Sequence, residues 1–174
     1  MSDLDLLRNA IRDVPDFPKP GIIFKDITPI LANPTLFKKA VHLMAETVGD
    51  QKIDKIVGIE ARGFIFGSAL AHHMGAGFVP IRKQGKLSGD TYKTSYTLEY
   101  GAAMIELRQD AIHPGEKALL VDDLLATGGT VAAAIQLLDQ LETDLIGIAV
   151  LVELGFLKGR EKLANQTIFS ILQY

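Results

Sequence analysis

Residues 118–130, with the sequence ALLVDDLLATGGT, combine residue types that together can bind a phosphate. Two adjacent glycines near the end of this segment let several backbone N–H groups converge on one anion, because no Cβ stands in the way. Two threonines add hydroxyl donors. A helical pattern begins near residue 130, and the N-terminus of a helix favours a phosphate through its unpaired N–H groups and its dipole. The residues expected to hold the phosphate are Ala126, Thr127, Gly128, Gly129 and Thr130.

A pair of acids, Asp122 and Asp123, precedes this phosphate loop. Carboxylates cannot hold a second phosphate by themselves, but they can accept hydrogen bonds from the vicinal hydroxyls of a ribose or join a magnesium site through water. Ribose 5-phosphate fits this arrangement. No lysine follows the glycines and GxGxxG is absent, which argues against a Walker A motif and a dinucleotide fingerprint. The remaining alternative is a strand-to-helix turn that binds nothing.

A second loop, GIEARGFIFG over residues 58–67, also joins a predicted strand to a predicted helix. Its Arg62 carries a planar guanidinium that can hold a phosphate through parallel N–H donors. The alternative is an arginine at a helix start that pairs with Glu60.

A basic segment follows between residues 79 and 95, although the whole chain has a net charge of −3. It holds Arg82, Lys83, Lys86 and Lys93 against the single acid Asp90. A mildly acidic protein with one concentrated basic segment fits a small polyanion as ligand and argues against a nucleic acid partner.

The elements that must position these loops alternate between strands and helices. This alternation predicts an α/β fold, with a mostly parallel sheet between helical layers. The segment 15–34 holds five of the seven prolines, so we expect it to be extended and not a regular helix. Helices are expected from Ser2, where Asp5 completes a capping box, and from Pro34, over 64–74 and from about 130 to 142. Strands are expected over 55–59, 77–81, 102–107, 118–121, 145–154 and 167–172.

Length and composition favour one soluble domain over residues 1–174. Hydrophobic residues make up 48% of the 174 residues, which supports a sizeable core. The chain has no cysteine, and no apolar run approaches the roughly 20 residues of a membrane span. Its start lacks the pattern of a signal peptide, so a cytoplasmic location is the default expectation.

These loops resemble those of the type I phosphoribosyltransferase family. Residues 118–130 are similar to its signature for 5-phosphoribosyl 1-diphosphate (PRPP), and residues 58–67 are similar to its pyrophosphate loop. The resemblance implies the fold of that family with a small N-terminal hood, and a cis peptide between Glu60 and Ala61. It also implies that magnesium enters with PRPP and water, without a metal site built from the protein alone. The four histidines show no metal-binding spacing.

Two further segments resemble the adenine-specific branch of the family. Residues 81–101 are similar to its catalytic lid, which we place at 82–97, with Glu99 matching the family's catalytic carboxylate. That match implies proton transfer with the purine by Glu99, while Arg62 and the lid cations Arg82, Lys83 and Lys86 offset the charge of the leaving diphosphate. Arg62 and Lys86 are accordingly counted with Glu99 as catalytic.

The second segment, FPKPGIIFKDITP over residues 17–29, resembles the adenine-binding hood, which we place at 15–34. The resemblance implies that the Ile23 carbonyl accepts from the 6-amino group, that the Lys25 backbone N–H donates to ring nitrogen 1, and that Phe24 and Leu154 pack on the two ring faces. Many members have arginine where Lys25 stands. Because backbone groups are expected to read the base, we predict that this departure matters little.

The implied activity makes AMP and diphosphate from adenine and PRPP in purine salvage, and the family implies a homodimer. Two alternatives stay open: a 6-oxopurine or xanthine phosphoribosyltransferase, and a non-catalytic PRPP-sensing regulator. Hypoxanthine would mismatch the hood twice, and unpaired buried polar groups reject such near-isosteres strongly. A regulator would need a DNA-binding module or a basic face.

Overall fold

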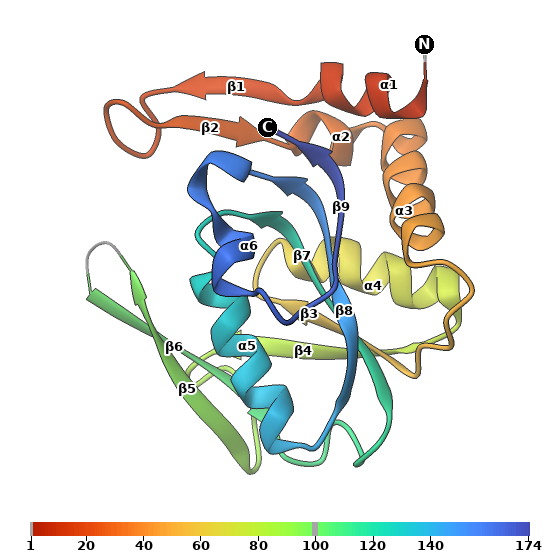
Figure 1. Ribbon diagram of the computed structural model, residues 1–174, viewed down its shortest axis with the longest axis vertical. Coiled ribbons are helices and arrows are strands. Elements are labelled where there is room, and N and C mark those ends of the chain that lie inside the picture. The colour runs from red at the N-terminus through yellow and green to blue at the C-terminus, as the bar shows by residue number, and fades with distance from the viewer. Residues whose placement is uncertain (1, 99–100) are drawn as a thin grey trace. The chain divides into compact units, whose positions relative to one another are not determined.

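The computed structural model describes residues 2–98 and 101–174 (Figure 1). The chain divides into two compact units, Met1–Leu43 and Met44–Tyr174, and each is described by itself. No helix in the described residues has the length and apolarity of a membrane span. The expectation of one domain over 1–174 stays a prediction.

The first unit begins with helix α1 (Asp3–Ala10), which starts at the predicted capping box. The Ser2 hydroxyl accepts from the Asp5 backbone N–H at 3.1 Å, and the Asp5 carboxylate accepts from the Ser2 N–H at 2.9 Å. These bonds occupy donors that otherwise have no partner in the helix.

The proline-rich segment of the first unit forms a hairpin and one short helix. Strands β1 (Arg12–Pro15) and β2 (Ile23–Asp26) pair antiparallel, as expected for an extended segment. The expectation of no helix was wrong over α2 (Thr28–Ala32), where Pro29 stands in the first turn. Proline is accepted there because an N–H in the first turn has no acceptor within the helix. Helix α3 (Pro34–Val48) begins as predicted, with the Asn33 side chain accepting two N–H groups.

The second unit is built on a seven-stranded sheet with the order β5-β6-β4-β3-β7-β8-β9. The pairs among β4, β3, β7, β8 and β9 are parallel, whereas β6 pairs antiparallel with β4 and with β5. The predicted mostly parallel sheet is thus confirmed. Its strands are β3 (Lys55–Ile59), β4 (Gly77–Lys83), β5 (Thr91–Leu98), β6 (Gly101–Arg108), β7 (Lys117–Leu125), β8 (Asp144–Glu153) and β9 (Ile168–Gln173).

Two crossover connections leave the centre of this sheet in opposite directions. The chain passes from β3 through α4 (Gly63–Met74) to β4 on one side, and from β7 through α5 (Gly129–Gln140) to β8 on the other. Crossovers between parallel strands are right-handed as a rule, so two that run in opposite directions place their helices on opposite faces of the sheet (Figure 1). The strand order reverses between β3 and β7, and ligands of open α/β sheets bind at such a point, outside the carboxyl ends of the strands.

The central strands are apolar because both of their faces are covered. Ala118, Leu119, Leu120 and Val121 of β7 are all fully buried, as their unbroken apolar run predicts. This core fixes the strand ends from which the polar loops extend.

The predicted lid begins in a tight turn and continues as a strand. After β4 ends at Lys83, a turn leads into β5, which pairs with β6 along its whole length. The lid placed at 82–97 therefore contains a strand from Thr91 onward, which was not among the predicted strands. The Thr94 hydroxyl donates to the Gln136 side chain of α5 at 2.8 Å. This hydrogen bond connects β5 to helix α5.

Candidate active site

The acid pair lies where β7 outlasts one of its two neighbours. Pairing between β7 and β3 ends at Val121, whereas pairing between β7 and β8 continues to Leu125. Asp122 and Asp123 are therefore inside the strand and not beyond its end, which corrects the expected boundary at residue 121. Beside them β3 no longer pairs with β7, because β3 has already turned into the loop at residues 60–62.

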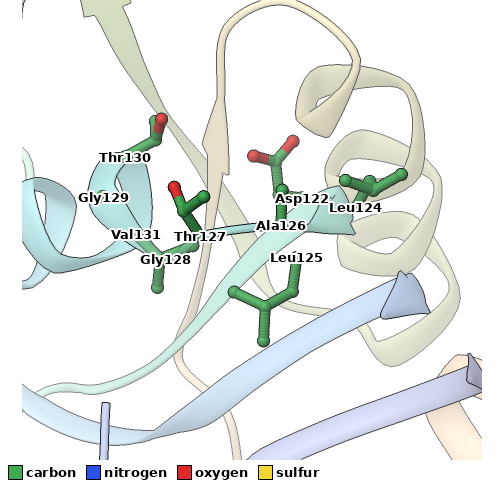
Figure 2. Close-up of a pocket in the computed structure, with 9 residues that line it drawn as sticks. All are labelled: Asp122, Leu124, Leu125, Ala126, Thr127, Gly128, Gly129, Thr130 and Val131. Carbon is green, nitrogen blue, oxygen red and sulfur yellow. The ribbon is translucent and has the colours of Figure 1, made fainter. Parts of the chain in front are cut away.

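The predicted phosphate loop lines a small pocket at the end of β7. The pocket extends from Asp122 to Val131, and its volume of ≈ 80 Å³ has room for a group the size of several water molecules. In Figure 2 the Asp122 carboxylate and the hydroxyls of Thr127 and Thr130 lie on one side of the strand and loop, and Leu125 points to the other. The structure thus brings the acid and the phosphate loop together, as predicted.

The loop enters helix α5 through Gly128, which has φ = 78°. This is the left-handed region, which glycine adopts without the steric cost that a Cβ brings. No side chain caps the helix in the described structure. The first N–H groups of α5 consequently face the pocket without side-chain acceptors, which suits an anion.

The two carboxylates differ in exposure but have pKa values shifted in the same direction. Asp123 is only 4% exposed, whereas Asp122 is partly exposed. Burial raises the pKa of Asp122, and the charge of Asp123 raises it further. Burial also raises the pKa of Asp123, although the Arg62 guanidinium opposes that rise. A group that donates hydrogen bonds to this pair, or carries positive charge, would relieve both effects.

Arg62 pairs with Asp123 and not, as the simpler alternative had it, with Glu60. The Arg62 Nε atom lies 2.9 Å from Asp123 Oδ2. Within the described structure that oxygen accepts no aligned hydrogen bond, so the contact is an ion pair whose N–H points past the oxygen. The next residue, Gly63, makes this approach feasible, because a Cβ there would lie 2.7 Å from the Val121 carbonyl oxygen.

Glu60 instead holds the start of the lid. Its carboxylate accepts from Arg82 Nε at 3.2 Å and Arg82 Nη2 at 3.3 Å, and from the Lys83 backbone N–H at 2.9 Å. Burial acts to raise the pKa of Glu60, but these donors and the charge of Arg82 outweigh it and lower the pKa. The peptide from Glu60 to Ala61 is cis, which confirms the geometry that the resemblance implied.

The turn that carries Lys86 is anchored by Glu106, which the sequence analysis did not single out. Glu106 is 1% exposed and accepts from the backbone N–H groups of Lys86 at 2.9 Å and Leu87 at 2.8 Å. Arg82 Nη1 donates to the Lys86 carbonyl at 3.1 Å. The only signal in the sequence was an acid among the apolar residues of a predicted strand.

The remaining predicted residues lie in several elements. Leu154 directly follows β8 and is 9% exposed. Ile23, Phe24 and Lys25 lie on β2 of the first unit. Glu99 lies outside the described residues.

The Lys25 side chain makes an ion pair across the hairpin, with Nζ 2.6 Å from Asp13 Oδ1. Phe24 meets Phe17 edge to face, with 5.2 Å between ring centroids. These contacts are local to the first unit.

The described residues contain no group of three or more histidine, cysteine or acidic residues placed to hold a metal ion. The acid pair still fits magnesium that arrives with its own oxygen ligands. Asp122 is partly exposed and lines the pocket, and carboxylate oxygens are among the ligands that magnesium takes alongside water and substrate phosphates.

Comparison with known proteins agrees with this geometry. Residues 26–171 match the model of the phosphoribosyl transferase domain. An adenine phosphoribosyltransferase of Halothermothrix orenii is 56% identical over 96% of this chain and 98% of its own length. The chain belongs to the adenine phosphoribosyltransferases. Solved structures of this family have closely similar folds.

Two of these structures illustrate the similarity. The adenine phosphoribosyltransferase of Rhodothermus marinus has a TM-score of 0.93 and 50% identity, covering 99% of this chain and 98% of that one. The adenine phosphoribosyltransferase of Saccharomyces cerevisiae, complexed with an imino-altritol bisphosphate and adenine, has a TM-score of 0.93 and 45% identity, with 98% of each chain covered. Both support the expected fold of the family, with its mostly parallel sheet and small N-terminal sheet.

Proposed function

We infer that this chain transfers the 5-phosphoribosyl group of PRPP to nitrogen 9 of adenine, forming AMP and releasing diphosphate in purine salvage. The observation that carries the inference is the pocket lined by Asp122 and residues 124–131, where one acid of the pair and an uncapped helix start meet in a chain of this family. Adenine is assigned as the base because full-length relatives act on it by name and because the yeast relative was solved with adenine.

The reaction breaks the bond from C1′ to diphosphate and forms the bond from C1′ to nitrogen 9, which loses its proton. The departing diphosphate gains negative charge while the sugar gains positive charge. Groups that are fixed in place before the reaction stabilise such changes most, because they need no reorganisation.

The phosphate loop holds the end of the sugar that does not react. Backbone N–H groups of residues 126–130 and the hydroxyls of Thr127 and Thr130 donate to the 5′-phosphate. Asp122 and Asp123 accept from the ribose hydroxyls. Their task is positioning, which converts binding energy into a productive orientation of C1′.

Cations on two loops offset the charge of the departing diphosphate. Arg62 is held by Asp123 at the first loop, and Lys83 and Lys86 are exposed at the start of the lid. Arg82 contributes its charge from within its pair with Glu60. When bound, magnesium would neutralise diphosphate oxygens, with Asp122 and Asp123 reaching it through water or through the ribose hydroxyls.

We assign recognition of the base to Ile23, Phe24, Lys25 and Leu154. The assignment rests on the resemblance of the hood, and of the segment that begins after β8, to the family. The Ile23 carbonyl and the Lys25 backbone N–H would read the adenine edge. Glu99 would exchange the proton with the purine. A homodimer is part of the same proposal, and size-exclusion chromatography coupled to light scattering tests it.

One competition experiment tests the assigned activity. The protein is incubated with PRPP, magnesium and equimolar adenine, hypoxanthine and guanine, and the nucleotides are identified by mass. AMP is the expected product. IMP or GMP in preference to AMP would overturn the base assignment, and no nucleotide at all would favour a PRPP-sensing regulator.

A further inference from the structure

We propose that Gly159 and Arg160, which contact no part of the substrate in the proposed site, position the phosphate loop by supporting it from behind. The inference rests on the proposed assignment of residues 126–130 to the 5′-phosphate. It concerns the short turn η1 (Gly155–Leu157) and helix α6 (Gly159–Lys162), which follow β8.

The support is a close backbone contact between two glycines. A Cβ on Gly159 would overlap the Ala126 carbonyl oxygen, and a Cβ on Gly128 would lie 2.9 Å from the Gly159 carbonyl oxygen. The backbone at residue 159 therefore fills the space under the phosphate loop, and neither partner has room for a methyl group. Since Gly128 is the N-cap residue of helix α5, this contact also helps to fix the position of the first N–H groups of that helix.

An ion pair holds Gly159 in this place. Arg160 Nε and Nη2 donate to the two carboxylate oxygens of Glu153 at 2.6 and 2.8 Å, and Nη2 also donates to the Ser170 hydroxyl at 3.1 Å. Glu153 is 5% exposed. Burial acts to raise the pKa of Glu153, but the hydrogen bonds and charge of Arg160 lead the effects that lower it. The carboxylate is thus ionised and able to hold the guanidinium.

The ion pair closes residues 153–160 into a loop anchored to the end of β7. Glu153 ends β8 and lies opposite Leu125, the last residue of β7. The Leu154 N–H donates to the Leu125 carbonyl at 2.9 Å. One end of the closed loop is therefore bonded to the residue immediately before the phosphate loop, and the other end carries Gly159 against Ala126. A bidentate arginine pair fixes both distance and orientation, which a lysine would not.

The test measures the contribution of the phosphate to binding. Isothermal titration gives the affinities of AMP and of adenosine, which lacks the phosphate, for the wild type and for Gly159→Ala. The added methyl displaces the Ala126 carbonyl and the N–H groups after it. We expect the ratio of AMP to adenosine affinity to fall roughly 10- to 100-fold, as for other small misplacements of binding groups, while the adenosine affinity stays near the wild-type value.

Gly155→Ala is the matched control in the same loop. A Cβ on Gly155 would meet only the Tyr174 carbonyl oxygen, at an ordinary 3.4 Å, so we expect an unchanged ratio. Arg160→Lys and Arg160→Gln form a second series for the case in which Gly159→Ala does not fold. The ratio of AMP to adenosine affinity should be highest in the wild type, lower in Arg160→Lys and lowest in Arg160→Gln. Melting temperatures confirm that each variant is folded.

The outcomes separate this inference from the function on which it rests. Equal weakening of AMP and adenosine in the variants, or no weakening of either, would overturn the positioning role. A wild-type protein that binds AMP no better than adenosine would overturn the phosphate site itself, and the positioning role with it.

Discussion

Arg62, in the loop that follows β3, pairs with Asp123 near the end of β7, with 2.9 Å between Nε and Oδ2. The pair crosses the point where the strand order reverses, so the cation assigned to diphosphate and the acid assigned to ribose hold each other in register. Geometry and electrostatics are linked here, because Arg62 also opposes the effect of burial on the pKa of Asp123.

Replacing Arg62 by lysine should lower kcat/KM for PRPP roughly 100-fold, comparable to removing one fixed charge-stabilising donor in other enzymes. Lysine keeps the charge but loses the planar fork. Steady-state kinetics with PRPP varied measures the effect. Arg8→Lys is the control, since Arg8 is exposed in the last turn of α1 and should retain wild-type kinetics. Equal kinetics for both variants would contradict the role of Arg62.

Asp122→Asn should stabilise the ligand-free protein at neutral pH while reducing activity roughly tenfold or more through lost ribose positioning. The pKa of Asp122 is raised by burial and by Asp123, so the folded protein holds this proton more tightly than the unfolded chain does. The stability that this provides is complete below the unfolded pKa and is lost as pH rises through the folded pKa.

The melting temperature of the wild type should accordingly fall relative to that of Asp122→Asn as pH rises from 3 toward neutral. Differential scanning calorimetry across this range measures it. If the melting temperature of the wild type instead rose relative to that of Asp122→Asn with rising pH, the sign would contradict this explanation.

Glu106→Ala should destabilise the turn that carries Lys86. The substitution removes the acceptor of the Lys86 and Leu87 N–H groups, and each buried donor left unpaired costs roughly 1–3 kcal/mol. Glu106→Gln keeps an oxygen that can accept both hydrogen bonds, so its free energy of unfolding should fall much less than that of the alanine variant. Urea unfolding gives the stabilities, and kcat should fall with alanine and recover largely with glutamine. Equal losses for the two variants would mean that charge, and not the shared acceptor, matters.

Lys25→Ala should leave the choice of base unchanged, because the backbone N–H of residue 25 is retained. The side chain pairs with Asp13, whose side chain is 57% exposed, so the loss of stability should be at most about 1 kcal/mol. The competition assay with adenine and hypoxanthine measures the product ratio. A shift toward IMP would assign base recognition to the lysine side chain.

Glu99→Gln should lower kcat for adenine roughly 100-fold with little change in the PRPP affinity, because proton transfer by a positioned side chain contributes typically 10²–10⁴-fold. Single-turnover kinetics and equilibrium binding of PRPP separate the two. Unchanged turnover would remove Glu99 from the mechanism.

The sequence by itself determined the parts of this protein that depend on local chemistry. The apolar run at 118–121 predicts a buried strand, the glycines at 128 and 129 predict a ligand loop, and alternating elements predict the parallel sheet, because each signal depends on neighbouring residues. Strand ends were less certain. β7 continues through Asp122 and Asp123 because β8 runs beside it to Leu125, and that partner is distant in the chain.

The tertiary structure decided which charges meet. Glu60 pairs with Arg82 and Arg62 with Asp123, whereas proximity in sequence favoured Glu60 with Arg62. Glu106 and the Glu153–Arg160 pair gave no distinctive signal, since an acid in a strand and a charged stretch near a terminus are ordinary features of surfaces. Burial by residues far along the chain turns such groups into anchors, because only a buried carboxylate must find every one of its partners within the fold.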